Sequence, residues 1–348
     1  MKALRVRRGE IGASLRDVPA PSPGEGEVLI RITAAGLCGT DLSAADVPAA
    51  GLVTLPEITL GHEPAGVIAE LGPGVQGWTV GDRVVVSSIV TCGRCSLCSR
   101  GMSEICSRAT VIGLNHDGAV AELMLAPAVN LVRLPDSVPD DVGAILTDAV
   151  ATPFHALVTR GRLVPGETVA IFGVGGLGQH AVQLARAFGA GRLIAVDSRP
   201  EQLEHALALG ADHAFLSTDP DLADKMRAVN GGSGVDLAGV FVGSSAAIAV
   251  AFRSVAKGGR LVVVGLTEDS VVLPPSSSFA RREISLIGSG GFRMDELGHL
   301  VDLVGVGRLD LSTSISHRLP LEDAEAALDL LRSKTEAPRR VVIVPSSG

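Results

Sequence analysis

Four of the five cysteines in this 348-residue chain fall within one short segment. Two residues separate Cys92 from Cys95 and Cys95 from Cys98, and seven residues separate Cys98 from Cys106. Four thiolates at this spacing can enclose one Zn²⁺ tetrahedrally, leaving no open coordination position, which favours a structural metal site. Disulfides and an iron–sulfur cluster are the alternatives; disulfides suit an oxidising compartment, and this loop lacks a second set of cluster ligands. We therefore predict a structural zinc site.

A second segment, residues 168–197, could bind a dinucleotide. Its glycines follow the spacing Gly173-x-Gly175-x-x-Gly178: the first permits a tight turn, the second admits a pyrophosphate, and the third allows close helix–strand packing. The N–H groups that begin the following helix favour phosphate charge. Asp197 follows roughly 20 residues later, where a carboxylate can accept ribose hydroxyls and repel a 2′-phosphate. The segment predicts NAD rather than NADP, although Arg199 could accommodate that phosphate.

The elements that must position these groups change character along the chain. Residues 1–35 and 60–86 contain short apolar runs broken by glycine and proline, which is typical of a β-rich module. Apolar strands then alternate with helical segments, which predicts a doubly wound parallel sheet. We expect these strands at 168–172, 193–196, 235–242, 260–265 and 284–288. The change of character places a domain boundary near residue 153. The segment from 292 onward, with helix 321–333 and strand 341–344, is expected to return to the first module.

Composition excludes several classes of function. The net charge is −8, aromatic residues make up 3% of the chain and tyrosine is absent, so neither a basic nor a stacking surface for nucleic acid is indicated. No run of about 20 apolar residues occurs, and residues 1–8 lack the apolar core of a secretory signal. We expect a cytoplasmic protein that binds neither nucleic acid nor membrane.

Six motifs, in this order along the chain, resemble those of the zinc-dependent, medium-chain alcohol dehydrogenase family. They are Cys38-Gly-Thr-Asp41, Gly61-His62-Glu63-x-x-Gly66, Gly81-Asp82-Arg83-Val84, the four-cysteine segment, Thr147-Asp148-Ala149, and Gly173-Val-Gly-Gly-Leu-Gly178. The resemblance implies a GroES-like catalytic domain (1–153, with a structural-zinc lobe at 92–106), a Rossmann coenzyme domain (154–290) and a C-terminal return (291–348). The short segment after Cys106 resembles that of bacterial members, which implies a homo-oligomer, with a tetramer favoured over a dimer.

The resemblance also implies a second, catalytic zinc ion held by Cys38, His62 and Asp148, with the fourth position open. Glu63 would be an alternative or neighbouring carboxylate, and Asp41 would orient His62. Thr40 would accept the alcohol proton; many relatives have a histidine three residues later, where this chain has Ser43. His116 and His155 remain alternatives for completing the metal site. Further coenzyme contacts are assigned to Thr152, Gly176, Leu177, Arg199, Gly265 and Arg340.

The expected activity is hydride transfer between an alcohol, or its aldehyde or ketone, and NAD(H), with two Zn²⁺ per chain. The segment 46–56 is rich in Ala, Val, Leu and Pro, which favours an apolar substrate. One alternative is a zinc-free quinone or enone reductase of the same fold. Another is a non-catalytic NADH-binding protein.

Overall fold

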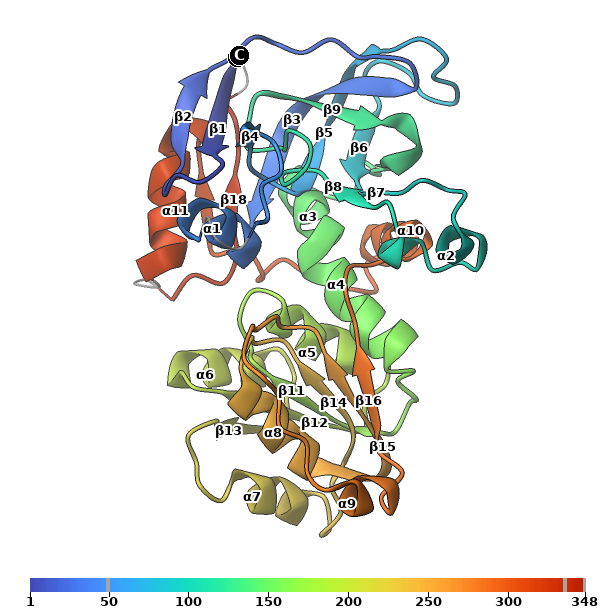
Figure 1. Ribbon diagram of the computed structural model, residues 1–348, viewed down its shortest axis with the longest axis vertical. Helices are drawn as coiled ribbons and strands as arrows, with labels where there is room; N and C mark the ends of the chain where they lie inside the picture. The colour runs from blue at the N-terminus through green and yellow to red at the C-terminus, as the bar shows by residue number, and fades with distance from the viewer. Residues whose placement is uncertain (48–50, 334–336, 347–348) are drawn as a thin grey trace. The chain divides into compact units, whose positions relative to one another are not determined.

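The computed structural model describes residues 1–47, 51–333 and 337–346, and the chain divides into two compact units (Figure 1). Unit 1 comprises residues 1–151 and 291–348, and unit 2 comprises residues 152–290. The chain therefore leaves unit 1 two residues before the predicted boundary at 153 and re-enters it at Gly291.

The secondary structure of unit 1 is mainly short strands. Its strands are β1 (Lys2–Arg7), β2 (Ser14–Asp17), β3 (Glu27–Leu37), β4 (Glu57–Thr59), β5 (Glu63–Leu71), β6 (Arg83–Val86), β7 (Ile89–Val90), β8 (Thr110–Val111), β9 (Leu123–Pro127), β10 (Leu131–Arg133), β17 (His317–Leu319) and β18 (Val341–Ile343). Its helices and helical turns are α1 (Gly39–Asp46), α2 (Ser96–Ser99), η2 (Ser103–Ile105), η3 (Ala128–Asn130), α3 (Asp140–Ile145), η4 (Leu146–Val150), α10 (Met294–Gly305), η6 (Leu321–Asp323) and α11 (Ala324–Ser333).

The described strands of unit 1 form three sheets. The largest has the order β10-β6-β5-β3-β18-β17, with β9 also paired to β3; the other two are β2-β1-β4 and β7-β8. The C-terminal segment contributes directly, because β18 lies antiparallel to β3 with Val341 opposite Leu37. Leu321, Leu328 and Val341 join the same buried core as Leu4 and Ile30. The return of the chain to unit 1 thus completes both its main sheet and its core.

Unit 2 contains a six-stranded parallel sheet with the order β13-β12-β11-β14-β15-β16. Its strands are β11 (Thr168–Phe172), β12 (Arg192–Asp197), β13 (His213–Leu216), β14 (Val235–Val240), β15 (Val255–Val263) and β16 (Ser285–Gly288). Its helices are η5 (His155–Arg160), α5 (Gly178–Ala187), α6 (Pro200–Ala208), α7 (Leu222–Val229), α8 (Ser245–Ser254) and α9 (Ser276–Ala280), and α4 (Ala151–Phe154) joins it to unit 1.

Both faces of the central strands β11 and β12 are buried. In β11, Val169 and Ile171 pack in one core with α5, whereas Ala170 and Phe172 pack in a second core with α8. Successive side chains of a strand point to opposite faces, so a parallel strand covered on both faces needs apolar side chains at every position. Strand β15 begins five residues before the predicted start at Arg260, because its pairing with β14 continues through a register shift near Val235.

One long helical run crosses from unit 1 to unit 2. Residues 140–160 form 21 helical residues with a mean hydropathy of 1.3, long and apolar enough by composition to cross a membrane. However, 83% of the most apolar 18-residue stretch of this run is buried inside the protein, so the run is a core helix. Its apolar composition reflects that burial. Two stretches, η4 and η5, are π-helical, a distortion often found at functional sites.

Candidate metal centres and coenzyme site

Three separate parts of unit 1 bring together a thiol, an imidazole and two carboxylates. Cys38 follows β3, His62 and Glu63 lie at the start of β5, and Asp148 lies on the π-helical turn η4. One ligand atom from each of the four lies within 4.8 Å of the others. The Sγ of Cys38 is 3.5 Å from Oδ2 of Asp148, and Nε2 of His62 is 3.6 Å from the same oxygen. The structure therefore clusters the three predicted ligands together with Glu63.

Asp41 contacts the backbone and the imidazole that position this cluster. Its completely buried carboxylate accepts the backbone N–H of Cys38 at 2.9 Å and that of Gly61 at 3.1 Å. Its Oδ1 also lies 3.3 Å from Nδ1 of His62. A carboxylate behind an imidazole fixes the ring orientation, leaving Nε2 to face a metal ion.

Glu63 is paired with a cation from the far end of the chain. Its Oε2 accepts a hydrogen bond from Arg340, while its buried Oε1 has no hydrogen-bond partner among the described residues. Burial raises the pKa of Glu63 to about 7, although Arg340 and His62 oppose this rise. The structure thus places Arg340 on Glu63 in unit 1, and its predicted contact with the coenzyme stays a prediction.

The donor set of this cluster fits zinc. Thiolate, imidazole and carboxylate are the ligand types that Zn²⁺ takes in catalytic sites, where three protein ligands leave one position open. Burial lowers the pKa of His62, but the carboxylates of Asp41 and Asp148 outweigh burial and raise it well above its ordinary value. The cluster is therefore a site that attracts positive charge, and a metal ion would take the place of the proton.

Thr40, which is predicted to accept the alcohol proton, and Ser43, which stands where many relatives have a histidine, both lie on α1. Thr40 Oγ1 is 3.9 Å from the Sγ of Cys38, next to the ligand cluster. Ser43, one turn further along, donates its hydroxyl to the carbonyl of Gly39 at 3.1 Å. Residues 48–50 of the segment expected to contact substrate lie outside the described residues.

The two alternative histidines lie outside the ligand cluster. Nε2 of His116 is 2.7 Å from Oγ1 of Thr110, at an exposed position on the loop after β8. His155 is buried in η5, the second π-helical stretch. Neither histidine belongs to the two groups of potential metal ligands found among the described residues.

The second of these groups consists of Cys92, Cys95, Cys98 and Cys106. The sulfur of Cys95 lies 3.5 Å from that of Cys98 and 3.8 Å from that of Cys106, which lies 3.5 Å from the sulfur of Cys92. Four sulfurs around one Zn²⁺ at 2.3 Å would be about 3.8 Å apart, so the arrangement fits a tetrahedral site. None of the five cysteines forms a disulfide.

Charge explains why this lobe needs a cation. Hydrogen bonds from backbone N–H groups, chiefly that of Cys98, lower the pKa of Cys95 to about 5. Burial and the neighbouring thiols raise the pKa of Cys98 to about 12. The four thiols cannot all ionise together unless a bound cation offsets their repulsion.

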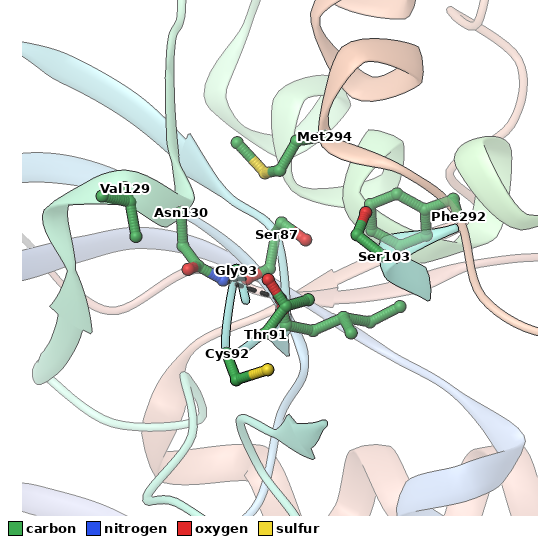
Figure 2. A pocket seen from close by; sticks show the side chains of 10 residues that line it. Ser87, Thr91, Cys92, Gly93, Ser103, Val129, Asn130, Phe292 and Met294 are labelled. Carbon is green, nitrogen blue, oxygen red and sulfur yellow. Dashed lines mark hydrogen bonds between the residues drawn. The ribbon is translucent and has the colours of Figure 1, made fainter. Parts of the chain in front are cut away.

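A cavity of about 380 Å³ lies beside this lobe in unit 1 (Figure 2). Asn130 forms part of its wall and donates to the carbonyls of Ser87 and Ile89 at 2.8 and 2.9 Å. The rest of the lining consists of hydroxyl and apolar side chains, Gly93 and the thiol of Cys92 from the lobe. None of the four clustered groups around His62 contributes to it. We therefore do not assign the reaction to this cavity.

In unit 2 the glycine-rich turn lies between β11 and α5, as predicted. Gly173 has a φ of +85°, and a Cβ at Gly178 would lie 1.8 Å from the carbonyl oxygen of Gly173. Asp197 ends the adjacent strand β12, and its Oδ2 accepts the N–H of Val174 at 2.7 Å. The predicted ribose-binding carboxylate therefore also anchors the turn.

The remaining predicted coenzyme residues lie on several elements of unit 2. Leu177 is the N-cap of α5, and the carbonyl of Gly176 faces Nε2 of Gln179 at 3.5 Å. Gly265 follows β15 and donates its N–H to Val240 at 3.1 Å. Thr152 is buried in α4. Their contacts with a dinucleotide stay predictions.

The glycines at 175 and 178 are expected to differ when replaced by alanine. No atom lies within 4 Å of a Cβ built at Gly175, so Gly175→Ala should keep the thermal midpoint and weaken NADH binding by about tenfold or more. Gly178→Ala forces the backbone apart and should lower the thermal midpoint by several degrees. Differential scanning fluorimetry and NADH titration measure the two effects. Equal behaviour of the two variants would contradict this division of roles.

Sequence comparison identifies the family. Residues 24–136 match the alcohol dehydrogenase GroES-like domain, and residues 176–305 match the zinc-binding dehydrogenase domain. An L-threonine 3-dehydrogenase from Bacillus velezensis is 32% identical over 348 residues, which cover 99% of each chain. The chain belongs to the zinc-dependent medium-chain alcohol dehydrogenase family.

Solved structures resemble this dehydrogenase over its whole length. Alcohol dehydrogenase TADH from Thermus sp. ATN1 is 29% identical with a TM-score of 0.91, over 99% of this chain and 100% of that chain. A putative zinc-binding dehydrogenase from Sinorhizobium meliloti bound to NADP is 28% identical with a TM-score of 0.88, over 99% of each chain. The predicted fold class, a GroES-like domain with a Rossmann domain, is confirmed, as are an alcohol-oxidoreductase function and zinc and a nicotinamide dinucleotide as cofactors.

Sequence reasoning did not find every polar group at these sites. It missed the pairing of Arg340 with Glu63, because nothing local links residues 277 positions apart. It also missed Gln202 of α6, which is buried beside the glycine-rich turn. The only available signal for Gln202 was a lone amide inside the apolar face of a helix.

Proposed function

We propose that this dehydrogenase interconverts a small secondary alcohol and its ketone with NAD(H). The clustering of Cys38, His62 and Asp148 in unit 1 carries the proposal, because these three ligands leave one position for a substrate oxygen. A secondary alcohol is the group that an L-threonine 3-dehydrogenase, by its name, oxidises. The apolar character of segment 46–56 favours aliphatic members of this class.

The residues divide the chemistry between them. Cys38, His62 and Asp148 would hold zinc, whose Lewis acidity lowers the pKa of an alcohol and polarises a ketone. His62 keeps Nε2 directed at the cluster because Asp41 lies behind Nδ1. Thr40, beside Cys38, is positioned to accept the proton that the alcohol loses. Ser43 stands where many relatives have a histidine, and its hydroxyl donates to the carbonyl of Gly39, so the proton would leave Thr40 by a route that does not use a side chain at position 43.

The broader assignments belong to the same proposal. Residues 1–153 and 291–348 would form the catalytic domain, with the lobe at 92–106 as its structural-zinc module, and residues 154–290 would bind the coenzyme. Asp197 would select NAD, with Arg199 beside it. We also propose a cytoplasmic homo-tetramer.

Coenzyme preference and substrate class are tested together. Initial rates should be measured with aliphatic secondary alcohols, L-threonine and the matching ketones, using both NAD(H) and NADP(H). We expect kcat/KM to be at least about tenfold higher with NAD(H), because the Asp197 carboxylate accepts ribose hydroxyls and repels a 2′-phosphate. Higher kcat/KM with NADPH than with NADH would refute the preference. Turnover of none of the secondary alcohols or ketones would refute the substrate class.

A further inference from the structure

The glycine-rich turn of unit 2 is held at one residue, Val174, by hydrogen bonds to both its N–H and its carbonyl. The N–H of Val174 donates to Asp197 Oδ2 at 2.7 Å. The carbonyl of Val174 accepts from the side-chain amide of Gln202 at 2.8 Å. Val174 is fully buried and Gln202 is 2% exposed, so water cannot replace these hydrogen bonds. Asp197 and Gln202 therefore form a clamp on the residue between the first two glycines.

The same amide reaches Arg199. With the nitrogen of Gln202 facing the Val174 carbonyl, its oxygen accepts from Nη2 of Arg199 at 3.3 Å. These partners fix the amide orientation, because the reverse would place oxygen against oxygen and nitrogen against nitrogen. The Nε of Arg199 also lies 3.8 Å from Oδ1 of Asp197. The guanidinium is thus held between a buried amide and a buried carboxylate.

This arrangement bears on how the site rejects a phosphorylated dinucleotide. A guanidinium near the ribose is the group that accommodates a 2′-phosphate in proteins that bind NADP. Arg199 stands two residues after Asp197, at the place where such a group is expected. Its contacts with Asp197 and Gln202 would have to be broken before it could form a forked pair with phosphate. The presence of the arginine therefore does not by itself favour NADP.

We propose that Gln202 is a specificity-determining residue, which ties Arg199 to the glycine-rich turn and withholds it from a 2′-phosphate. The proposal rests on the proposed NAD preference and explains how that preference survives an adjacent arginine. It differs from a purely structural role, in which Gln202 would support the Val174 carbonyl and affect both dinucleotides equally.

The test compares dissociation constants of NADH and NADPH, measured by titration calorimetry on the zinc-loaded enzyme. Gln202→Met keeps the length of the side chain but removes both hydrogen bonds. It should weaken NADH binding by about tenfold, while freed Arg199 preserves NADPH binding, so that the preference for NADH falls by about tenfold. Gln202→Glu cannot donate to the Val174 carbonyl but still accepts from Arg199, so it should weaken both dinucleotides and keep the preference.

Arg199→Ala separates the two roles. In that background Gln202→Met should weaken both dinucleotides equally and leave the preference unchanged. Glu204→Gln, an exposed change on the same helix, is the matched control and should change neither constant. An unchanged preference in Gln202→Met, or a fall that persists without Arg199, would overturn the proposal. A wild-type enzyme that binds NADPH more tightly would refute the NAD preference separately, since the effect of Gln202 is read as a change in the ratio.

Discussion

Replacing Asp148 with asparagine is expected to lower kcat by about 100-fold or more and to remove about one zinc ion per chain. The carboxylate Oδ2 of Asp148 lies 3.5 Å from the Cys38 sulfur and 3.6 Å from Nε2 of His62, so it is the shared oxygen of the cluster. An amide keeps the shape of the side chain but loses the negative charge that helps to offset Zn²⁺. Zinc quantification and steady-state rates measure the two effects, and NADH binding in unit 2 should remain.

A matched control comes from the same helical run. His155→Asn should keep both zinc ions, because His155 lies outside the ligand cluster. Retention of both zincs and near-normal kcat in Asp148→Asn would contradict the assignment. In that case loss of zinc in His155→Asn would transfer the ligand role to His155, and loss in Glu63→Gln would transfer it to Glu63.

Replacing Cys95 with serine is expected to abolish metal binding by the four-cysteine lobe. It should also lower the free energy of unfolding of unit 1. The sulfur of Cys95 lies within 3.8 Å of those of Cys98 and Cys106, so its removal leaves three thiols without a complete coordination shell. Binding of a structural zinc contributes directly to folding free energy. A loss of about 4 kcal/mol would lower the thermal midpoint by about 8–16 °C in a domain of this size.

The control for this variant is the other metal site. Cys95→Ser should retain the zinc held by Cys38, His62 and Asp148, and protein that remains folded at low temperature should still turn over alcohol. Thermal unfolding followed together with zinc content tests both statements. An unchanged midpoint with two retained zincs would show that the lobe is not a structural zinc site.

The parts of the candidate sites whose arrangement can be inferred from sequence spacing are local. The four cysteines fall within 15 consecutive residues, and the glycine-rich turn with its flanking strand and helix fills one βα unit, so spacing alone indicates their geometry. The cluster of Cys38, His62 and Asp148 is different, because Cys38 and Asp148 are 110 positions apart in the sequence. Only the resemblance to a family predicted that these three residues lie together. Their spacing in the sequence does not indicate it.

Features that depend on tertiary packing could not be predicted. The π-helical turn that presents Asp148 looks in sequence like ordinary helix, because the pattern of apolar residues around it does not show one extra residue in a turn. The buried pairing of Arg340 with Glu63 depends on β18 returning beside β3. The position of Gln202 depends on where α6 packs against the glycine-rich turn. Chain topology determines each of these contacts.

The most direct test of the account is to remove the catalytic zinc selectively and to follow alcohol-dependent NADH formation. The purified protein should contain two zinc ions per chain, and a mild chelator should extract first the ion held by three protein ligands with an open position. We predict that alcohol oxidation falls in proportion to the loss of that one ion and returns when zinc is added back, while the thermal midpoint stays nearly constant. Full activity in protein that has lost that ion, or active protein that never contained more than one, would contradict the account.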